Sequence, residues 1–332
     1  MVQEPPFQIT PAILDLVVRI SRKIDSLEGA IFHERNLRLR RQNRIRSIYS
    51  SCAIEANSLS FVQVSDIVNG RRVVGQKKEI EEIKGATEAY NELSHVDPYS
   101  IDDFLKMHAV LTNGTVPESG KFRTVGEGVF AGDRLIFMAP PPEFVSEHMQ
   151  NLFAWMSRNK DSVNPLILSS AFHYEMVFIH PFTDGNGRMA RLWQTALLGN
   201  WNELFFWMPI ETRIHKSQED YYRTINLCNS QGDSTAFIEF MLRMILMSLE
   251  DVDFEIKETT PIINSRISRM LELMDPDRTY SSSELMRMLD LSSQPSFHRD
   301  YLRPSLDQGL LSMTEPDNPK SPNQRYRLTG RN

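Results

Sequence analysis

The stretch HPFTDGNGRMAR, residues 180 to 191, lies at the turning point of the fold that this sequence predicts. An apolar segment with helical spacing ends just before it, at Phe178 and Ile179, and another helical pattern follows Arg188. The Gly-Asn-Gly at its centre suits a backbone that bends through positive φ angles. We therefore expect residues 180 to 191 to form a loop between two helices.

The centre of this loop is predicted to bind an anion. Glycines that adopt positive φ can turn successive N–H groups toward one point and form an anion-binding nest. The nest lies at a helix N-terminus, where unpaired N–H groups and the helix dipole also favour a phosphate. Arg188 and Arg191 are three residues apart, so they share one helix face and can reach the same anion. The predicted phosphate-binding residues are Gly185, Asn186, Gly187, Arg188 and Arg191.

Asp184 and His180 add two further kinds of chemistry. Asp184 offers hard oxygen ligands that suit Mg²⁺ held between the protein and phosphate oxygens. A histidine with a reference pKa of about 6.5 is mostly neutral near pH 7, so His180 can accept a proton as a general base. Taken singly, the histidine suits a structural role and the aspartate a helix N-cap. Their combination with the nest and both arginines within twelve residues favours a catalytic site.

Helical spacing recurs through most of the first 250 residues, so the predicted fold is mainly α. Helices are expected in the first ninety residues, at 101–111, 142–156 and 165–178, after Arg188, and at 236–249. Between 120 and 142, four glycines separate short β-branched and aromatic segments, which predicts a small β-hairpin. We expect a helical region at 1–90, a core at 91–252 and a separate domain at 258–332, with a boundary near residue 255.

The last domain has the order helix, helix, helix, strand, loop, strand, which resembles a winged helix-turn-helix. From residue 262 onward it holds ten basic and nine acidic residues, a net charge of about +1. Such a charge is a weak electrostatic footprint for DNA. A structural or protein-contact role is therefore favoured over DNA binding, which stays the less favoured alternative.

Composition excludes several other classes. The net charge of -6 gives no overall attraction to nucleic acid or anionic lipid. The two cysteines, Cys52 and Cys228, cannot build a disulfide framework and suggest a reducing compartment. The sequence has neither a signal-peptide pattern at its start nor an apolar run of the roughly 18 residues that a membrane span needs. We therefore expect a cytoplasmic protein without a membrane partner.

Residues 180 to 191 resemble the signature of the Fic family, HPFx[D/E]GNGRxxR, at every specified position. Residues 120–123 (GKFR), the expected hairpin and residues 140–143 (PPPE) resemble the flap of that family, and the likeness to a Fic core covers about 90 to 250. The preceding helical region and the winged helix resemble segments that are often attached to this core. The resemblance implies a Fic-fold helical bundle with a small β-hairpin flap, plus a C-terminal winged helix-turn-helix domain.

The family resemblance implies adenylyl transfer, in which AMP moves from ATP to a Ser, Thr or Tyr hydroxyl of a target protein. His180 would then be the catalytic base, and Asp184 would hold Mg²⁺ on the α- and β-phosphates of ATP. Asn186, Gly187 and Arg188 would cradle the phosphates. Gly187 also favours the adenylylating branch, because relatives that transfer phosphate carry Lys at this position.

Two further groups of residues are implied by the resemblance. The flap would pair with an extended target segment by β-augmentation through Glu127, Gly128, Val129 and Phe130. Tyr221 and Asn229, in the segment YYRTINLCN, match positions that contact adenosine in similar proteins.

The segment SCAIEAN, residues 51 to 57, resembles the inhibitory helix motif of the family, [S/T]xxxE[G/N], with Ala56 in place of Gly or Asn. Ser51 and Glu55 are four residues apart and share one helix face. The resemblance implies that Glu55 pairs with Arg191 and denies it to the γ-phosphate of ATP, so that the enzyme is autoinhibited. Glu55→Gly is then expected to raise AMP transfer, and His180→Ala is expected to abolish it.

Three alternatives stay open from the sequence. The same glutamate can position a water that removes AMP, which would make the protein a deadenylylating enzyme. His173, His180 and Asp184 form a weaker metal pattern that suits a metal-dependent hydrolase, although His173 is expected to pack behind the loop. The third alternative is a transcription regulator that senses a nucleotide and acts through the winged helix. The sequence does not identify the target protein, and it leaves open whether the protein forms a homodimer.

Overall fold

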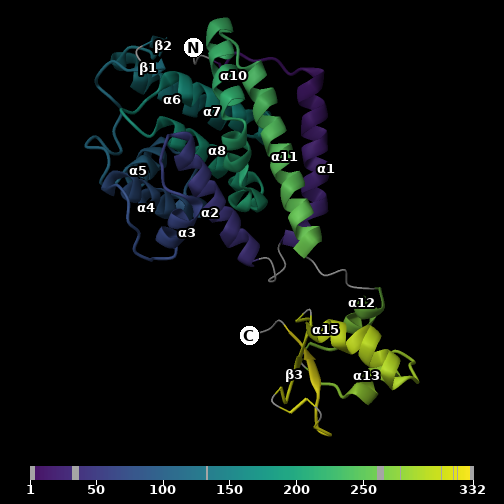
Figure 1. Cartoon of the computed structure of the whole chain (residues 1–332). Coiled ribbons are helices and arrows are strands. Elements are labelled where there is room, and N and C mark those ends of the chain that lie inside the picture. The colour runs from purple at the N-terminus through teal and green to yellow at the C-terminus, as the bar shows by residue number, and fades with distance from the viewer. Residues whose placement is uncertain are drawn as a thin grey trace. The chain divides into compact units, whose positions relative to one another are not determined.

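The computed structural model describes residues 4–31, 37–131, 134–259, 265–276, 278–307, 309–316, 318–319 and 321–329. The chain divides into two units, Met1–Asp253 and Phe254–Asn332 (Figure 1). Each unit has its own hydrophobic core. The division falls within the long helix α11 (Thr235–Thr259).

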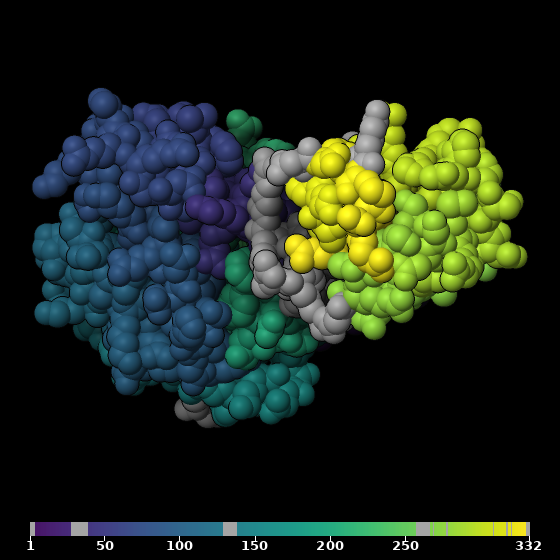
Figure 2. Space-filling model, turned by 90° about the horizontal axis from the view of Figure 1, so that it is seen from below, coloured from purple at the N-terminus to yellow at the C-terminus, as the bar shows by residue number. Residues whose placement is uncertain are grey.

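The first unit begins with helices, as the apolar spacing predicts. They are α1 (Pro11–Ile31), α2 (Leu37–Ile54), α3 (Phe61–Val68), α4 (Lys77–Glu92), the 3₁₀ turn η2 (Leu93–His95) and α5 (Ile101–Leu111). Ser60 and Gln63 form a capping box that starts α3, and the Ser100 side chain accepts a hydrogen bond from the backbone N–H of Asp103 at the start of α5. In Figure 2, α2 to α5 form the blue surface of this unit, and the later helices form the adjoining teal surface.

A two-stranded antiparallel hairpin follows in the segment where the glycines predict one. It consists of β1 (Gly128–Ala131) and β2 (Arg134–Met138). Gly128 pairs with Met138, and the register shifts between Val129 and Phe130. The remaining elements of the unit are α6 (Pro142–Asn159), α7 (Pro165–Ile179), α8 (Asn186–Trp201), the 3₁₀ turn η3 (Glu203–Trp207), α9 (Ile210–Lys216), α10 (Gln218–Gln231) and α11.

The core of this unit holds α7 in place. Almost every residue of α7 from Leu166 to Met176 is buried, as expected of a helix that is apolar on all sides. Phe104 packs against Trp193 with ring centroids 5.1 Å apart and against Phe182 at 5.5 Å. Because Phe182 belongs to the loop between α7 and α8, this aromatic cluster fixes the loop to the core.

The long helices α1 and α11 lie side by side and run in the same direction (Figure 1). Thr10 Oγ1 donates to Glu239 Oε1 at 2.7 Å near one end, and Lys23 Nζ lies 2.5 Å from Asp253 Oδ2 near the other. No described helix combines the length and the hydrophobicity that crossing a lipid bilayer would require.

The second unit has the predicted order of three helical segments followed by a hairpin. The elements are α12 (Ser265–Glu272), α13 (Ser282–Met288), α14 (Gln294–Phe297), the π-helical turn η4 (His298–Leu302), α15 (Arg303–Asp307), β3 (Leu311–Met313) and β4 (Tyr326–Leu328). Leu285, Phe297 and Leu302 are fully buried in its core. The mainly α fold with a small hairpin, predicted from the sequence, is confirmed.

Candidate active site

The loop between α7 and α8 is built by two left-handed residues and one side-chain clamp. His180 ends α7 with φ 51° and ψ 60°, and Gly185 precedes α8 with φ 84°. The Asn186 side chain closes the loop, because its Oδ1 accepts from Phe182 N–H at 2.9 Å and its Nδ2 donates to Phe182 O at 2.7 Å. The side chain of Asn186 is therefore committed to the loop itself, and what it offers a ligand is its backbone N–H at the start of α8.

The imidazole of His180 is neutral, and a hydrogen bond fixes the orientation of its ring. Its Nδ1 lies 3.3 Å from the carbonyl oxygen of Val177, so this nitrogen is the donor and Nε2 keeps its lone pair. Burial lowers the pKa of His180 below its ordinary value. Near pH 7 the ring can accept a proton at Nε2.

Asp184 carries the negative charge of the loop. Its Oδ1 accepts from Arg188 Nη2 at 3.1 Å and from Gly185 N–H at 2.6 Å, and its Oδ2 lies 3.4 Å from Lys78 Nζ. Burial opposes ionisation, but Arg188 and Lys78 outweigh it and lower the pKa of Asp184.

The oxygens of Asp184 fit a magnesium ion that is shared with a ligand. The described residues contain no group of three or more His, Cys, Asp or Glu side chains that could enclose a metal. Mg²⁺ commonly binds through one or two carboxylates and completes its shell with phosphate oxygens and water. The Asp184 side chain, 41% exposed and held in place, suits that arrangement.

Arg188 is a buried guanidinium with spare donors. Its side chain is 3% exposed, and its Nη1 lies 3.7 Å from Glu82 Oε1. Its Nε and Nη1 are buried and have no hydrogen-bond partner in the described part of the chain. Because unsatisfied buried donors are costly, these two nitrogens are suited to an anion that enters the loop.

Arg191 is held by the end of α2. It donates from Nη2 to Ser51 O at 2.9 Å and to Glu55 Oε1 at 2.8 Å, and from Nε to Ser51 Oγ at 3.1 Å. Burial favours the neutral form, but Glu55 outweighs it and raises the pKa of Arg191. Its Nη1 is buried without a hydrogen-bond partner among the described residues. The structure thus brings Ser51 and Glu55 into contact with Arg191, which follows them about 140 positions later in the sequence.

Glu55 also occupies space above the first turn of α8. A Cβ built on Gly187 would collide with Glu55 Oε1 and lie 3.2 Å from Arg191 Nη1. A side chain at position 187 would therefore displace this ion pair, which gives a local physical reason for glycine there.

The end of α2 is a strained turn. Ala56 adopts φ 63°, a left-handed conformation that costs a residue with a Cβ about 1–2 kcal/mol. Asn57 then donates from Nδ2 to Glu82 Oε2 at 2.9 Å, and Gln218 Nε2 donates to Ile54 O at 3.1 Å. The turn that carries Glu55 is thereby fastened to both α4 and α10.

The flap is tied to the loop by Arg123, a residue that sequence reasoning missed as functional. Arg123 is 2% exposed and donates to Val125 O at 2.8 Å, Pro140 O at 2.6 Å and His180 O at 2.7 Å. Its guanidinium therefore joins both ends of the hairpin segment to the end of α7. The backbone of the expected docking residues Glu127, Gly128, Val129 and Phe130 forms β1 and the position just before it.

The two residues matched to adenosine contacts, Tyr221 and Asn229, both lie on α10. Tyr221 is 1% exposed, and its hydroxyl lies 2.9 Å from Nε2 of His173. Asn229 Oδ1 accepts from Tyr174 at 2.9 Å. Tyr221 is thus packed into the wall behind the site, whereas Tyr222 is 40% exposed and its hydroxyl lies 3.4 Å from Ile54 O.

His173 packs behind the loop. Its ring is fully buried between Gln194 and Tyr221, and burial lowers its pKa to about 3. It forms no metal group with His180 and Asp184 in the described structure. The metal-dependent hydrolase pattern therefore has no geometric support.

Three residues near the loop, Lys78, Glu82 and His108, were missed by sequence reasoning. Lys78 and Glu82 reach Asp184 and Arg188 from α4, about 106 positions earlier in the chain. His108 on α5 stacks on Phe182 at 3.5 Å and accepts from Gly120 N–H at Nδ1, so its Nε2 donates to Asp184 O at 3.1 Å. Burial lowers the pKa of His108 to about 4, which keeps it neutral in this positioning role. A histidine on the apolar face of a helix was the one sign available.

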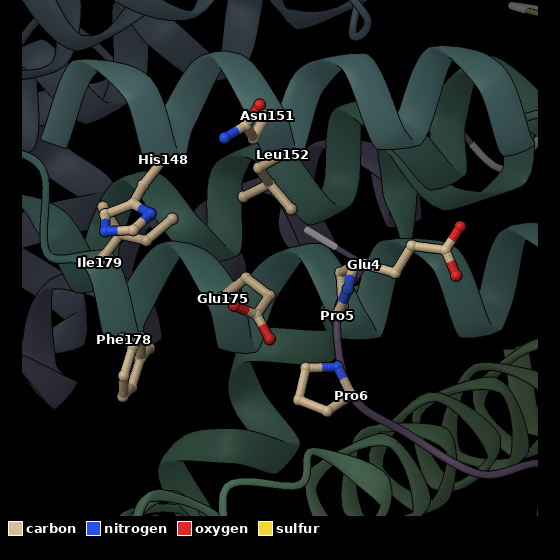
Figure 3. A pocket seen from close by; sticks show the side chains of 9 residues that line it. All are labelled: Glu4, Pro5, Pro6, His148, Asn151, Leu152, Glu175, Phe178 and Ile179. Carbon is tan, nitrogen blue, oxygen red and sulfur yellow. The ribbon is translucent and has the colours of Figure 1, made fainter. Parts of the chain in front are cut away.

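A pocket lies beside the end of α7 (Figure 3). It is enclosed by residues 4–6 and by side chains of α6 and α7, among them His148, Glu175 and Phe178. Burial raises the pKa of Glu175 to about 7. Its volume of about 90 Å³ is well below the roughly 300–1,000 Å³ of small-molecule sites, so it cannot take a whole nucleotide.

A helical unit with a loop of this kind between two buried helices, and a hairpin tied to that loop, defines the Fic class of fold. The Fic/DOC family model matches residues 98–198, and the C-terminal domain model of the Filamentation induced by cAMP protein Fic-like matches residues 265–329. A crystal structure of a Fic family protein from Desulfovibrio desulfuricans G20 is 40% identical, covers 99% of each chain and has a TM-score of 0.73. The chain belongs to the Fic family.

Curated relatives carry a more specific name. Protein adenylyltransferase fic-1 of Caenorhabditis elegans is 28% identical over 276 residues, which are 79% of this chain and 52% of the relative. Protein adenylyltransferase Fic of Nematostella vectensis is 32% identical over 205 residues, 59% of this chain and 45% of the relative. The chain thus spans about half the length of the curated relatives it matches.

Proposed function

We propose that this protein transfers AMP from ATP to a Ser, Thr or Tyr hydroxyl of a target protein. The observation that carries the proposal is a set of buried guanidinium nitrogens at the N-terminus of α8, Arg188 Nε and Nη1 and Arg191 Nη1, that have no hydrogen-bond partner among the described residues. Donors of this kind at a helix N-terminus suit a polyphosphate. The names of the curated relatives agree with this reaction.

In the proposed mechanism, the backbone N–H groups of Asn186 and Gly187 and the two arginines hold the phosphates in line for attack, while the Gly185 N–H holds the Asp184 carboxylate. Asp184 would hold Mg²⁺, which when bound supplies positive charge to the α- and β-phosphate oxygens. His180 accepts the proton of the target hydroxyl at Nε2. The hydroxyl oxygen then bonds to the α-phosphorus as the bond to pyrophosphate breaks.

The target side of the site is the hairpin. Among the described residues, β1 and β2 pair only with each other, so an extended target segment can pair with the outer edge of the hairpin. Arg123 fixes the hairpin relative to His180 and would therefore set the distance between the target hydroxyl and the base. Main-chain pairing imposes little side-chain selection, and Glu127, Gly128, Val129 and Phe130 are the proposed contact residues.

Glu55 is the proposed brake. It holds Arg191 at 2.8 Å and lies where a Cβ on Gly187 would be, so it competes with the triphosphate for both the charge and the space. ATP can bind productively only when Glu55 leaves Arg191.

The test uses ATP labelled on the α-phosphate, with Mg²⁺ and a cell lysate. We expect Glu55→Gly to label protein strongly and Glu55→Gly with His180→Ala to leave it unlabelled. Glu55→Gly with His95→Ala, which removes an exposed histidine, serves as the matched control and should still label. Labelling from ATP carrying the label on its γ-phosphate, or labelling that survives the loss of His180, would contradict the proposal.

Removal of AMP is a second candidate, favoured by the free oxygen of Glu55. Its Oε1 binds Arg191, whereas its Oε2 has no hydrogen bond to any described residue. A water held by Oε2 beside the loop could attack an AMP-modified side chain. Incubating AMP-modified protein with the wild type and with Glu55→Gln tests this reaction, because label release that persists in Glu55→Gln, or is missing from both, would exclude Glu55 as the group that directs the water.

A further inference from the structure

A second cavity, of about 460 Å³, opens beside the first half of α2. Three arginines of α2 line it, Arg40, Arg41 and Arg44, together with Trp207 of η3 and polar side chains of α4 and η2. The volume lies within the range of small-molecule sites and is about five times that of the pocket in Figure 3. Its lining residues are distinct from those of the loop between α7 and α8.

The guanidinium groups of this cavity are held in place. Arg40 and Arg44 are four residues apart on one face of α2, and their guanidinium carbons lie 5.5 and 4.8 Å from the ring centroid of Trp207. Arg44 Nη1 also donates to Tyr90 O at 2.6 Å and to Asn91 Oδ1 at 3.1 Å, and Arg41 Nη2 donates to Asn69 Oδ1. Arginines anchored in this way lose little entropy when they bind an anion.

Two arginines of the cavity have no carboxylate partner among the described residues. Neither Arg41 nor Arg44 forms an ion pair with a carboxylate of the described residues, although the protein has 43 acidic residues against 37 basic ones. Arg44 Nε is buried and has no hydrogen-bond partner in the same described part. Burial lowers the pKa of Arg44 because it disfavours the charged form, and the charge of Glu211, which forms no ion pair with Arg44, offsets this only in part. An anion from outside would supply the missing partner.

We propose that this cavity binds a small phosphorylated molecule. Arginine forks match the oxygens of a phosphate group, and Arg41 and Arg44 together offer more positive charge than a single carboxylate would need. Asn91 and Ser94 add amide and hydroxyl groups to the wall, which suit the hydroxyls of a sugar or similar carrier of the phosphate. A volume of this size favours a small molecule over a polymer. The site is independent of the proposed AMP transfer.

Trp207 provides a local reporter of this binding, as one of four tryptophans in the chain. The full-length protein is titrated at constant ionic strength with inorganic phosphate and, separately, with ribose 5-phosphate, and its tryptophan fluorescence is recorded. We expect a saturable change that is absent in Trp207→Phe. A lower dissociation constant for ribose 5-phosphate than for phosphate would identify a phosphate ester as the ligand class, and the reverse order would identify the free ion.

Variants decide whether the arginines carry the binding. Arg41→Gln, which loses only its bond to Asn69, and Arg41→Gln with Arg44→Gln are expected to weaken binding about tenfold or more. Arg71→Gln, an exposed arginine paired with Asp66, and Arg188→Gln in the active-site loop should bind as the wild type does. Unchanged affinity in Arg41→Gln, or no saturable signal from either probe in the wild type, would overturn the proposal. Loss of the signal in Arg188→Gln alone would assign the binding to the active-site loop instead and overturn it equally.

Discussion

Replacing Glu55 is predicted to remove a measurable part of the interaction free energy that holds Arg191 away from ATP. The guanidinium of Arg191 makes two hydrogen bonds to Ser51 of α2 and one to Glu55 just after it, and only the bond to Glu55 joins opposite charges. A hydrogen bond to a charged group contributes about 1.5–3 kcal/mol. Because the Glu55 side chain is 34% exposed, solvent screens part of its attraction to Arg191. We therefore assign the lower part of that range, about 1.5–2 kcal/mol, to the Glu55–Arg191 hydrogen bond. At 1.36 kcal/mol for each factor of ten, Glu55→Gln should raise kcat/KM for ATP about 10- to 30-fold.

Two further variants separate charge from space. Glu55→Gln keeps a side chain above Gly187, whereas Glu55→Gly also empties the volume that a Cβ on Gly187 would occupy. Glu55→Gly should therefore be at least as active as Glu55→Gln. Ser51→Ala removes one bond from Oγ to Arg191 but leaves the Ser51 carbonyl and Glu55 in place, so we expect a change of less than about threefold.

The assay is the initial rate of AMP incorporation from ATP labelled on the α-phosphate, measured over a range of ATP concentrations. The reasoning is refuted if Glu55→Gln and Glu55→Gly label no faster than the wild type. It is also refuted if Ser51→Ala alone activates as strongly as Glu55→Gly, because the competing group would then not be the carboxylate.

Three other perturbations follow from the same geometry. Because burial lowers the pKa of His180, the acid limb of kcat/KM in the Glu55→Gly background should lie below pH 6.5, and a limb at or above that value in a pH–rate profile would contradict the neutral base. Ala56→Gly should stabilise the first unit by about 1 kcal/mol in urea unfolding, since glycine adopts φ 63° without strain; a lower midpoint would argue against strain at this turn. Arg123→Leu should lower AMP transfer about tenfold or more while ATP affinity, measured by calorimetry, stays within about threefold, and equal losses in both would show that Arg123 does more than position the flap.

The helices and the loop were open to prediction because their signals are local. The spacing of apolar residues predicted α5 over its full length, Ile101–Leu111, and the glycines between 120 and 142 predicted the hairpin. Family resemblance then led to Ser51 and Glu55, and a contact across about 140 positions would not have followed from spacing alone.

The packing around two predicted site residues shows which of their atoms are left for a ligand. Asn186 was expected to cradle phosphates, but its side chain is bonded to the backbone of Phe182, so only its backbone N–H remains for a ligand. Tyr221 was matched to adenosine, yet its hydroxyl lies on His173 inside the core. A sequence motif specifies which residue stands at a position, whereas which of its atoms stay free depends on the packing around it.

The charges around Asp184 show the limit of sequence reasoning most clearly. Lys78 and Glu82 look like ordinary solvated residues of α4, where an alternation of acidic and basic side chains is common. Packing of α4 beside the loop turns them into partners of Asp184 and Arg188, at 3.4 and 3.7 Å. Lys78 therefore lies beside the carboxylate that is proposed to hold Mg²⁺, and Glu82 offsets an arginine whose remaining donors have no acceptor among the described residues. The charge balance of the loop is thus set by a helix about a hundred residues away in the chain, and a full account of how it receives ATP has to include that helix.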